Sequence, residues 1–182
     1  QFAPAHLDFC ITGTPFAQMD IPVDCEWVPA AYSLPDLASV TPLRRHDFAI
    51  PDGAFVIASS GRHVKFRAPE FWRGVSDILC ALPDAHFVAI GVAADQVDLA
   101  ELSSAVADRI HCTGWRADNL NIVAMANAVL DTYPTGGGYA LTEAMAMGIP
   151  AMAFRNDHTR RFDQATWSPI EETIAIPDIL FP

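Results

Sequence analysis

Positive charge is scarce in this sequence. Its 182 residues include 11 lysines and arginines against 22 aspartates and glutamates, which gives a net charge of −11 at pH 7. A surface this acidic repels phosphate backbones, so we expect no nucleic-acid partner. No apolar run approaches the roughly 18 residues of a membrane span, so we also expect no transmembrane segment.

Cysteine is sparse as well. The four cysteines lie at positions 10, 25, 80 and 112, without any Cys-x-x-Cys spacing. Cys80 and Cys112 fall inside apolar runs, so we expect reduced thiols, mostly in a core, and a cytoplasmic location. His111 and Cys112 are adjacent, but no second pair stands at ligand spacing, so no zinc site is expected.

Apolar residues are abundant, at 51% of the chain, and exclude a disordered protein. Prolines at positions 29, 35, 42 and 51 interrupt any sustained period, which is typical of a connecting segment. The chain starts at Gln1, and both ends look cut. We therefore interpret residues 1–45 as the remnant of a preceding domain plus a linker. Residues 46–182 are expected to form one domain, and a truncated carboxyl end is left open.

Short apolar runs alternate with helical patterns from residue 54 onward. Strands are expected at residues 54–59, 86–90, 109–112, 128–131 and 151–154, with a sixth left open at 173–176. Helical spacing predicts helices at about 71–82, 97–106, 119–126 and 139–147. Such alternation indicates βαβ units, so the expected fold class is α/β, with a doubly wound, Rossmann-like parallel sheet. Ligands bind such sheets at the carboxyl ends of the strands.

The loop after the first of these strands carries the only lysine of the chain, Lys65. Lys65 and Arg62 are placed to reach an anion at the carboxyl edge, lysine as a point charge and arginine as a planar fork. The alternative is a solvated basic loop that pairs with surface acids.

The loop after the fourth strand is rich in glycine. Gly136, Gly137 and Gly138 precede a helix expected to start at Tyr139, and a helix start after glycines presents N–H groups to an anion. The pattern is neither a Walker loop nor G-x-G-x-x-G, and a plain turn is the alternative. Glu143 is expected in the first helical turn, either to compensate the helix dipole or to accept hydrogen bonds from a ribose diol.

A third loop, at residues 113–119, follows the third strand. A nucleobase could lie against its backbone, and we interpret Trp115 as a packing residue rather than a stacking platform.

Taken together, these loops resemble the carboxyl-terminal half of GT-B fold glycosyltransferases. The run from Thr142 to Pro150, Thr-Glu-Ala-Met-Ala-Met-Gly-Ile-Pro, carries the resemblance most specifically. The Leu-Asp-Thr run at 130–132 and the Arg-x-x-Lys run at 62–65 are similar to the O-linked N-acetylglucosamine transferase-like branch. Two departures stand out: Thr135 replaces the first Glu of a Glu-x7-Glu pattern, and residues 138–140 replace a His-Thr-Thr run.

The resemblance implies a donor-binding domain that transfers sugar from a nucleotide sugar, with a UDP-sugar as the expected donor. The acceptor would be held by a missing amino-terminal domain, and the present chain alone would be inactive. No Asp-x-Asp motif is present, so the resemblance implies neither a metal nor another cofactor. A GT-B fold sugar-nucleotide epimerase and a non-catalytic nucleotide-sugar binding module are the alternatives.

The resemblance also implies roles for individual residues. Lys65 and Arg62 would stabilise the diphosphate charge during catalysis. The implied donor contacts are Gly137, Gly138 and Tyr139 at the phosphates, Glu143 at the ribose, and Thr113, Gly114, Arg116 and Asn119 at the base.

Overall fold

Five parallel strands form the sheet at the centre of this protein. The computed structural model describes residues 10–12, 25–27, 33–99, 102–134, 136 and 138–154. The strands are β3 (Phe55–Ser60), β4 (Ala85–Ile90), β5 (Ile110–Cys112), β6 (Ala128–Leu130) and β7 (Ala151–Met152). They pair in the order β5-β4-β3-β6-β7, and every pair is parallel. This confirms the predicted doubly wound α/β fold and all five expected strands to within two residues. The possible strand at 173–176 lies outside the described residues.

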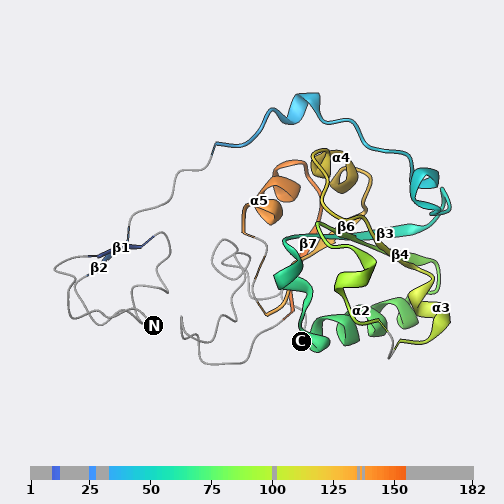
Figure 1. The fold of residues 1–182 in the computed structure, drawn as a ribbon. Helices are drawn as coiled ribbons and strands as arrows, with labels where there is room; N and C mark the ends of the chain where they lie inside the picture. Colours follow the sequence, from blue (N-terminus) through green and yellow to red (C-terminus); the bar gives the residue numbers. More distant parts are fainter. Residues whose placement is uncertain are drawn as a thin grey trace.

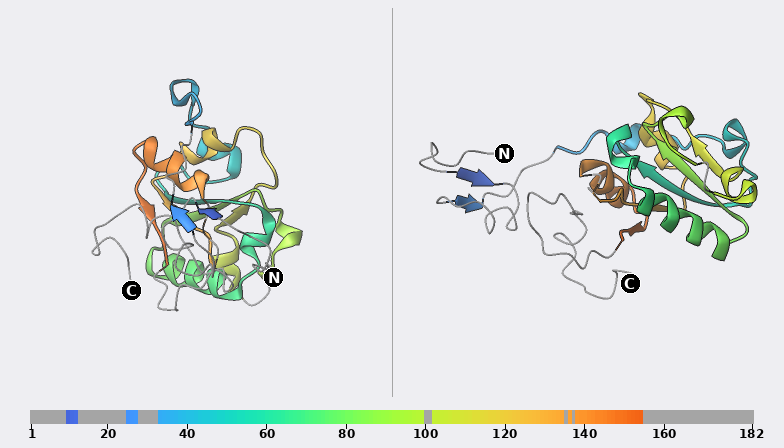
Figure 2. Two further views of the ribbon diagram at one scale, coloured as in Figure 1. Left: turned by 90° about the vertical axis from the view of Figure 1, so that its left-hand side faces the viewer. Right: turned by 60° about the horizontal axis from the view of Figure 1, so that its bottom comes forward.

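Helices cover both faces of this sheet (Figures 1 and 2). One face packs against α2 (Pro69–Ala81) and α3 (Ser104–Ala107), and the other against α4 (Asn119–Val123) and α5 (Tyr139–Ala146). The 3-10 turns are η2 (Leu37–Ser39), η3 (Arg45–Phe48), η4 (His63–Phe66) and η5 (Ala94–Gln96). Strands buried on both faces need continuous apolar runs, which explains why β3 and β4 lack a polar alternation.

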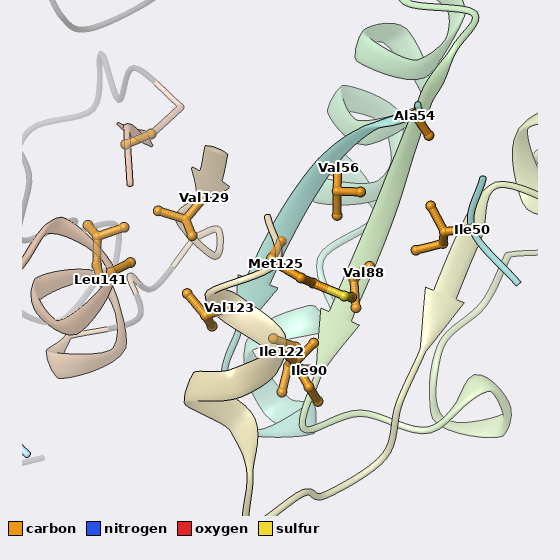
Figure 3. Close-up of a cluster of buried hydrophobic side chains, with 13 residues drawn as sticks. Ile50, Ala54, Val56, Val88, Ile90, Ile122, Val123, Met125, Val129 and Leu141 are labelled. Carbon is orange, nitrogen blue, oxygen red and sulfur yellow. The ribbon is translucent and has the colours of Figure 1, made fainter. Parts of the chain in front are cut away.

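The two faces of β3 build two separate cores. Val56 packs with Val88 on the α4–α5 side, as Figure 3 shows, whereas Ile57 packs with Phe87 on the α2 side. On the α2 side, Phe71 is fully buried at the centre of an aromatic cluster. Its ring centroid lies 5.2–6.0 Å from those of Trp72, Phe66, Phe87 and Phe154. Edge-to-face contacts of this kind add stability beyond the buried area.

Helix α2 is positioned by features at its start, along its length and at its end. Pro69 occupies the first turn, where its missing N–H is not needed. Gly74 lacks a Cβ that would otherwise lie 2.4 Å from the ring of Phe154, so the end of the sheet approaches the helix closely. At the other end, the Arg109 guanidinium donates to the carbonyls of Leu79 and Leu82 at 2.9 and 3.0 Å. Arg109 thereby satisfies carbonyls that a helix end leaves without partners.

Two of the predicted helices are shorter than expected. The helix predicted at 97–106 is restricted to α3, because Ser103 is extended and forms its N-cap. Serine competes for backbone hydrogen bonds and favours a helix start over a helix interior. The helix predicted at 119–126 ends at Val123, after which Met125 N donates to Ile122 O in a tighter turn.

The amino-terminal part contributes no strand to the five-stranded sheet within the residues described. β1 (Cys10–Thr12) and β2 (Cys25–Trp27) pair with each other in a separate parallel sheet. Closer to β3, Leu43 N donates to Asn121 O at 3.1 Å, and Arg45 donates to Ala54 O at 2.7 Å. Residues 43–45 are therefore hydrogen bonded to the domain that contains the five-stranded sheet. The proposed boundary at residue 45 stays a prediction.

Backbone hydrogen bonds link the loops that follow β3, β4 and β5. Gly61 N donates to Ile90 O at 3.0 Å, Gly91 N to Gly114 O at 2.9 Å, and Gly114 N to Val92 O at 2.8 Å. Gly91 has φ of +93°, and a Cβ there would lie 2.2 Å from Gly61 O. Only glycine fits this position, because it needs both the positive φ and the close approach.

A histidine pair joins β4 and β5. His86 Nδ1 and His111 Nε2 are 2.9 Å apart, and the rings stack with centroids 5.2 Å apart. One ring must donate a proton and the other accept it, so the two rings are not both cationic. Burial lowers the pKa of both, with Arg109 adding to the effect at His86 and His86 adding to it at His111.

Replacing Gly91 by alanine should destabilise the fold by about 2–5 kcal/mol, because strain at positive φ adds to the clash with Gly61 O. Gly148 is the matched control: its φ is +76°, but no atom lies within 4 Å of the position that a Cβ would take. Gly148→Ala should cost only about 1–2 kcal/mol. Urea unfolding of the two variants measures the difference, and equal losses would contradict the close contact.

The histidine pair predicts a pH dependence of stability. Since the folded state lowers both pKa values below about 6.5, protonation favours the unfolded chain as the pH falls below that value. The free energy of unfolding should therefore be lower at pH 5.5 than at pH 7.5. The double variant His86→Asn, His111→Asn should lose less over this range. Urea unfolding at both pH values measures this. The expectation is refuted if the free energy of unfolding falls as much in the double variant as in the native chain.

Candidate functional site

The strand order of the sheet reverses between β3 and β6. From β3 the chain moves to β4 and β5 on one side, and then returns to place β6 on the other side of β3. Connections that leave in opposite directions open a crevice at the carboxyl ends of the two strands, where open α/β sheets bind ligands. The loops that begin at Gly61 and Asp131 border this crevice.

A small pocket lies at this position. Its lining comes from the ends of β3 and β6, from α4 and from the first turn of α5: Ser60, Val123, Val129, Leu130, Asp131, Ala140 and Leu141. The polar side chains among them are Ser60 and Asp131, so the pocket is largely apolar with two polar groups at the strand ends.

The turn that carries Lys65 is anchored in the aromatic core. Phe66 is fully buried, and Trp72 Nε1 donates to Phe66 O at 2.7 Å. Lys65 N donates to Arg62 O at 2.9 Å, which closes the turn η4. The two basic residues predicted at this site therefore share one rigid turn.

Lys65 connects this turn to the glycine-rich loop. Its Nζ donates a hydrogen bond to Gly136 O. Burial lowers the pKa of Lys65, the negative charge of Asp131 raises it, and the positive charge of Arg62 lowers it. The side chain is thus a half-buried cation between two loops, and not a lysine extended into solvent.

Helix α5 starts at the glycine-rich loop. Gly138 is its N-cap, with φ of 62° and ψ of −124°, and glycine has no side chain with which to cap the helix. Glycine alone tolerates this backbone conformation readily. The positive end of the helix dipole therefore lies beside the loop that Lys65 contacts.

Glu143 lies in the second turn of α5, and the prediction of the first turn was wrong. The helix begins at Tyr139, so Glu143 is its fifth residue, and no acid occupies the first turn. Because the dipole effect falls off within the first turn, the alternative role in dipole compensation loses most of its physical basis.

The loop at 113–119 is shaped by its own hydrogen bonds. Thr113 Oγ1 donates to Gly114 O at 2.9 Å, and Gly114 has φ of +66°. Arg116 donates twice to Asp118, at 2.7 Å for each bond, and its guanidinium lies 6.0 Å from the centre of the Phe48 ring. This hydrogen-bonded pair lowers the pKa of Asp118. Asn119 is the first residue of α4.

The interpretation of Trp115 as a packing residue was wrong, because its side chain is 83% exposed. Gly114 turns the chain outward immediately before it. Val64 on η4 and Tyr139 on α5 are also large apolar side chains that are exposed. All three follow carboxyl ends of strands.

The structure brings some predicted site residues together and leaves others apart. Lys65 meets the glycine-rich loop, whereas Arg116 is engaged with Asp118. Gly137 lies outside the described residues. Sequence reasoning missed Asp131 as a site residue, although an acid directly after a buried strand was a usable signal. Binding roles for the predicted residues stay predictions.

The described part of the chain holds neither a cluster of metal ligands nor a membrane-spanning helix. No group of three or more His, Cys, Asp or Glu side chains there is arranged to hold a metal ion. No described helix has the length and apolar character needed to cross a membrane.

A family model described as "Glycosyl transferases group 1" matches residues 54–167, which is more than half of the chain. No curated protein matches.

Solved structures of similar fold include an Anabaena protein, Alr3699/HepE, in complex with UDP and glucose (17% identity, TM-score 0.59, 84% of this chain and 46% of that one). A Thermobaculum terrenum O-GlcNAc transferase mutant is 18% identical with a TM-score of 0.60, over 96% of this chain and 34% of that one. The pneumococcal O-GlcNAc transferase GtfA in complex with UDP and GlcNAc is 19% identical with a TM-score of 0.52, over 84% and 31%. The chain thus spans less than half of each of these structures.

Proposed function

The chain belongs to the group 1 glycosyl transferases, and on that premise we propose that it is the donor-binding domain of a glycosyltransferase. The proposed ligand is a nucleotide sugar, held in the crevice between the carboxyl ends of β3 and β6. The sugar passes to an acceptor bound elsewhere in the enzyme.

One observation carries this proposal: Lys65 spans the crevice at the reversal point of the sheet. It comes from the loop after β3 and donates to Gly136, in the loop after β6. Two residues further on, Gly138 starts α5. A cation and a helix amino terminus therefore lie on the same side of one crevice, and a diphosphate needs both kinds of donor.

The proposed rate advantage is electrostatic. When the bond between the sugar and the diphosphate breaks, negative charge builds up on the leaving phosphate. Lys65, Arg62 and the backbone N–H groups at the start of α5 are the groups proposed to stabilise that charge. No step in this scheme requires a metal ion.

The remaining donor contacts follow from position. Glu143 is proposed to accept hydrogen bonds from the ribose diol, and the loop at 113–119 to hold the base. The Anabaena and pneumococcal proteins of similar fold were crystallised with UDP, which supports a UDP-sugar as the donor.

Acceptor binding is proposed to come from an amino-terminal domain. The longer structures that this chain matches over less than half of their length support this expectation. Cys80 and Cys112 are free thiols, which agrees with the proposed cytoplasmic location.

Replacing Lys65 by methionine tests the diphosphate site, because methionine keeps the apolar stem and removes the charge. We expect UDP and pyrophosphate both to bind more weakly, by about 1.5–3 kcal/mol, the usual contribution of a hydrogen bond to a charged group. Titration calorimetry in EDTA measures this. Arg44→Met removes a charge from an exposed side chain before β3 and should leave both affinities unchanged. Absence of UDP binding by the native chain would contradict the proposed function.

Replacing Glu143 by alanine separates nucleotide from phosphate recognition. UDP should bind about 5- to 12-fold more weakly, because about 1–1.5 kcal/mol of hydrogen bonding to the ribose is lost. Pyrophosphate, which has no ribose, should bind as before. Equal losses for the two ligands in calorimetry would show that Glu143 supports the fold of α5 and does not read the ribose.

A further inference from the structure

Asp131 is a buried acid at the crevice to which the proposed function gives no role. It is 3% exposed, and no other charged residue of the described ranges is buried to this degree. Burying a carboxylate is costly unless partners compensate for the lost water. The groups around Asp131 are therefore the evidence for its role.

Backbone geometry places Asp131 close to Lys65, although none of the ion pairs within 4.0 Å in the described part of the chain joins the two. Asp131 directly follows β6, which pairs with β3, and Thr132 N donates to Asp131 Oδ1 at 2.9 Å. Gly61 shows where the lysine lies: a Cβ there would be 3.3 Å from Lys65 Cδ and 3.4 Å from Thr132 Cγ2. The aliphatic part of the Lys65 side chain and the Thr132 methyl group therefore both lie next to Gly61, which has no side chain of its own.

The polar end of Lys65 is fixed by the same arrangement. Its Nζ donates to Gly136 O, five residues after Asp131. Two charged groups act on the ammonium: Asp131 from the end of β6, and Arg62 from its own turn. Burial and Arg62 both lower the pKa of Lys65, and Asp131 opposes them.

We propose that Asp131 is a positioning residue: without contacting the Lys65 ammonium, its carboxylate attracts that ammonium toward the glycine-rich loop, an electrostatic pairing that preserves the cation of the anion site. The role at the donor diphosphate rests on the proposed function, whereas the pairing of Asp131 with Lys65 does not. Asp131 acts through Lys65 and touches no reacting atom.

The single lysine makes the pairing directly measurable. Growth on 13Cε-labelled lysine gives one side-chain signal from all 182 residues, and its pH titration by NMR reports the pKa of Lys65. In Asp131→Asn, which keeps the shape and the acceptor for Thr132 N, this pKa should fall by about one unit. Asp84→Asn removes an exposed acid from the turn before β4 and should leave it unchanged. If Lys65 had the same pKa in the native and Asp131→Asn chains, the pairing would be overturned.

A measurement on the native chain covers the case in which Asp131→Asn does not fold. The 13Cγ signal of Asp131 should show an inflection at the pH at which Lys65 loses its proton, because adjacent charges sense one another. A flat Asp131 signal through that range would also overturn the pairing.

Pyrophosphate binding tests the functional consequence. Between pH 7 and the upper end of the Lys65 titration, the affinity of Asp131→Asn should fall more than that of the native chain, by up to about tenfold, since one pKa unit is tenfold in proton affinity. Lys65→Arg in the Asp131→Asn background should restore the native profile, because arginine stays charged. A purely structural defect would lower affinity at both pH values without rescue, and would overturn the positioning role.

The two proposals fail in distinguishable ways. If the native chain binds no pyrophosphate or UDP, the proposed function fails, and the NMR titrations still decide the pairing. If the native chain binds both ligands while Asp131→Asn keeps the native pH profile, the proposed function stands and the positioning role is wrong.

Discussion

The parallel pairing of β3 with β4 on one side and β6 on the other is the constraint on which the rest of this structure depends. Because β3 is central and buried on both faces, its register aligns the carboxyl ends of its neighbours at one edge. The loops after β3, β4 and β5 are then close enough to hydrogen bond through Gly61, Gly91 and Gly114. The reversal of strand order at β3 opens the crevice, and no side chain has to create it.

The distribution of the few positive charges follows from this frame. Arg45 and Arg109 donate to backbone carbonyls around the strands and the end of α2, so they stabilise the fold. Arg116 is committed to Asp118. Among the residues that the structure describes, Lys65 and Arg62 bring positive charge to the crevice, on one turn anchored by the buried Phe66. In a chain with a net charge of −11, this concentrates attraction for an anion at one place.

A half-buried lysine and a buried acid lie close together at the crevice. Desolvation disfavours the charged form of Lys65, and an arginine three residues earlier adds to that effect. A carboxylate at the end of β6 opposes both, and the carbonyl of Gly136 accepts a hydrogen bond from the ammonium. The hydrogen bond from Lys65 joins its turn to the glycine-rich loop, and the proposed role of Asp131 adds the end of β6 to this connection.

The sequence by itself determined the strands, the parallel sheet and the loops that carry the site, because runs buried on both faces and glycine-rich turns are local signals. It also identified Lys65, the sole lysine, at a strand end. Only the tertiary structure decided that Trp115 is exposed, that Arg116 pairs with Asp118, and that Asp131 lies close to Lys65. Asp131 and Lys65 are 66 positions apart, and what joins them is the pairing of β6 with β3 across the reversal point. Contacts between distant strands depend on the order of the sheet, and local periodicity carries no record of that order.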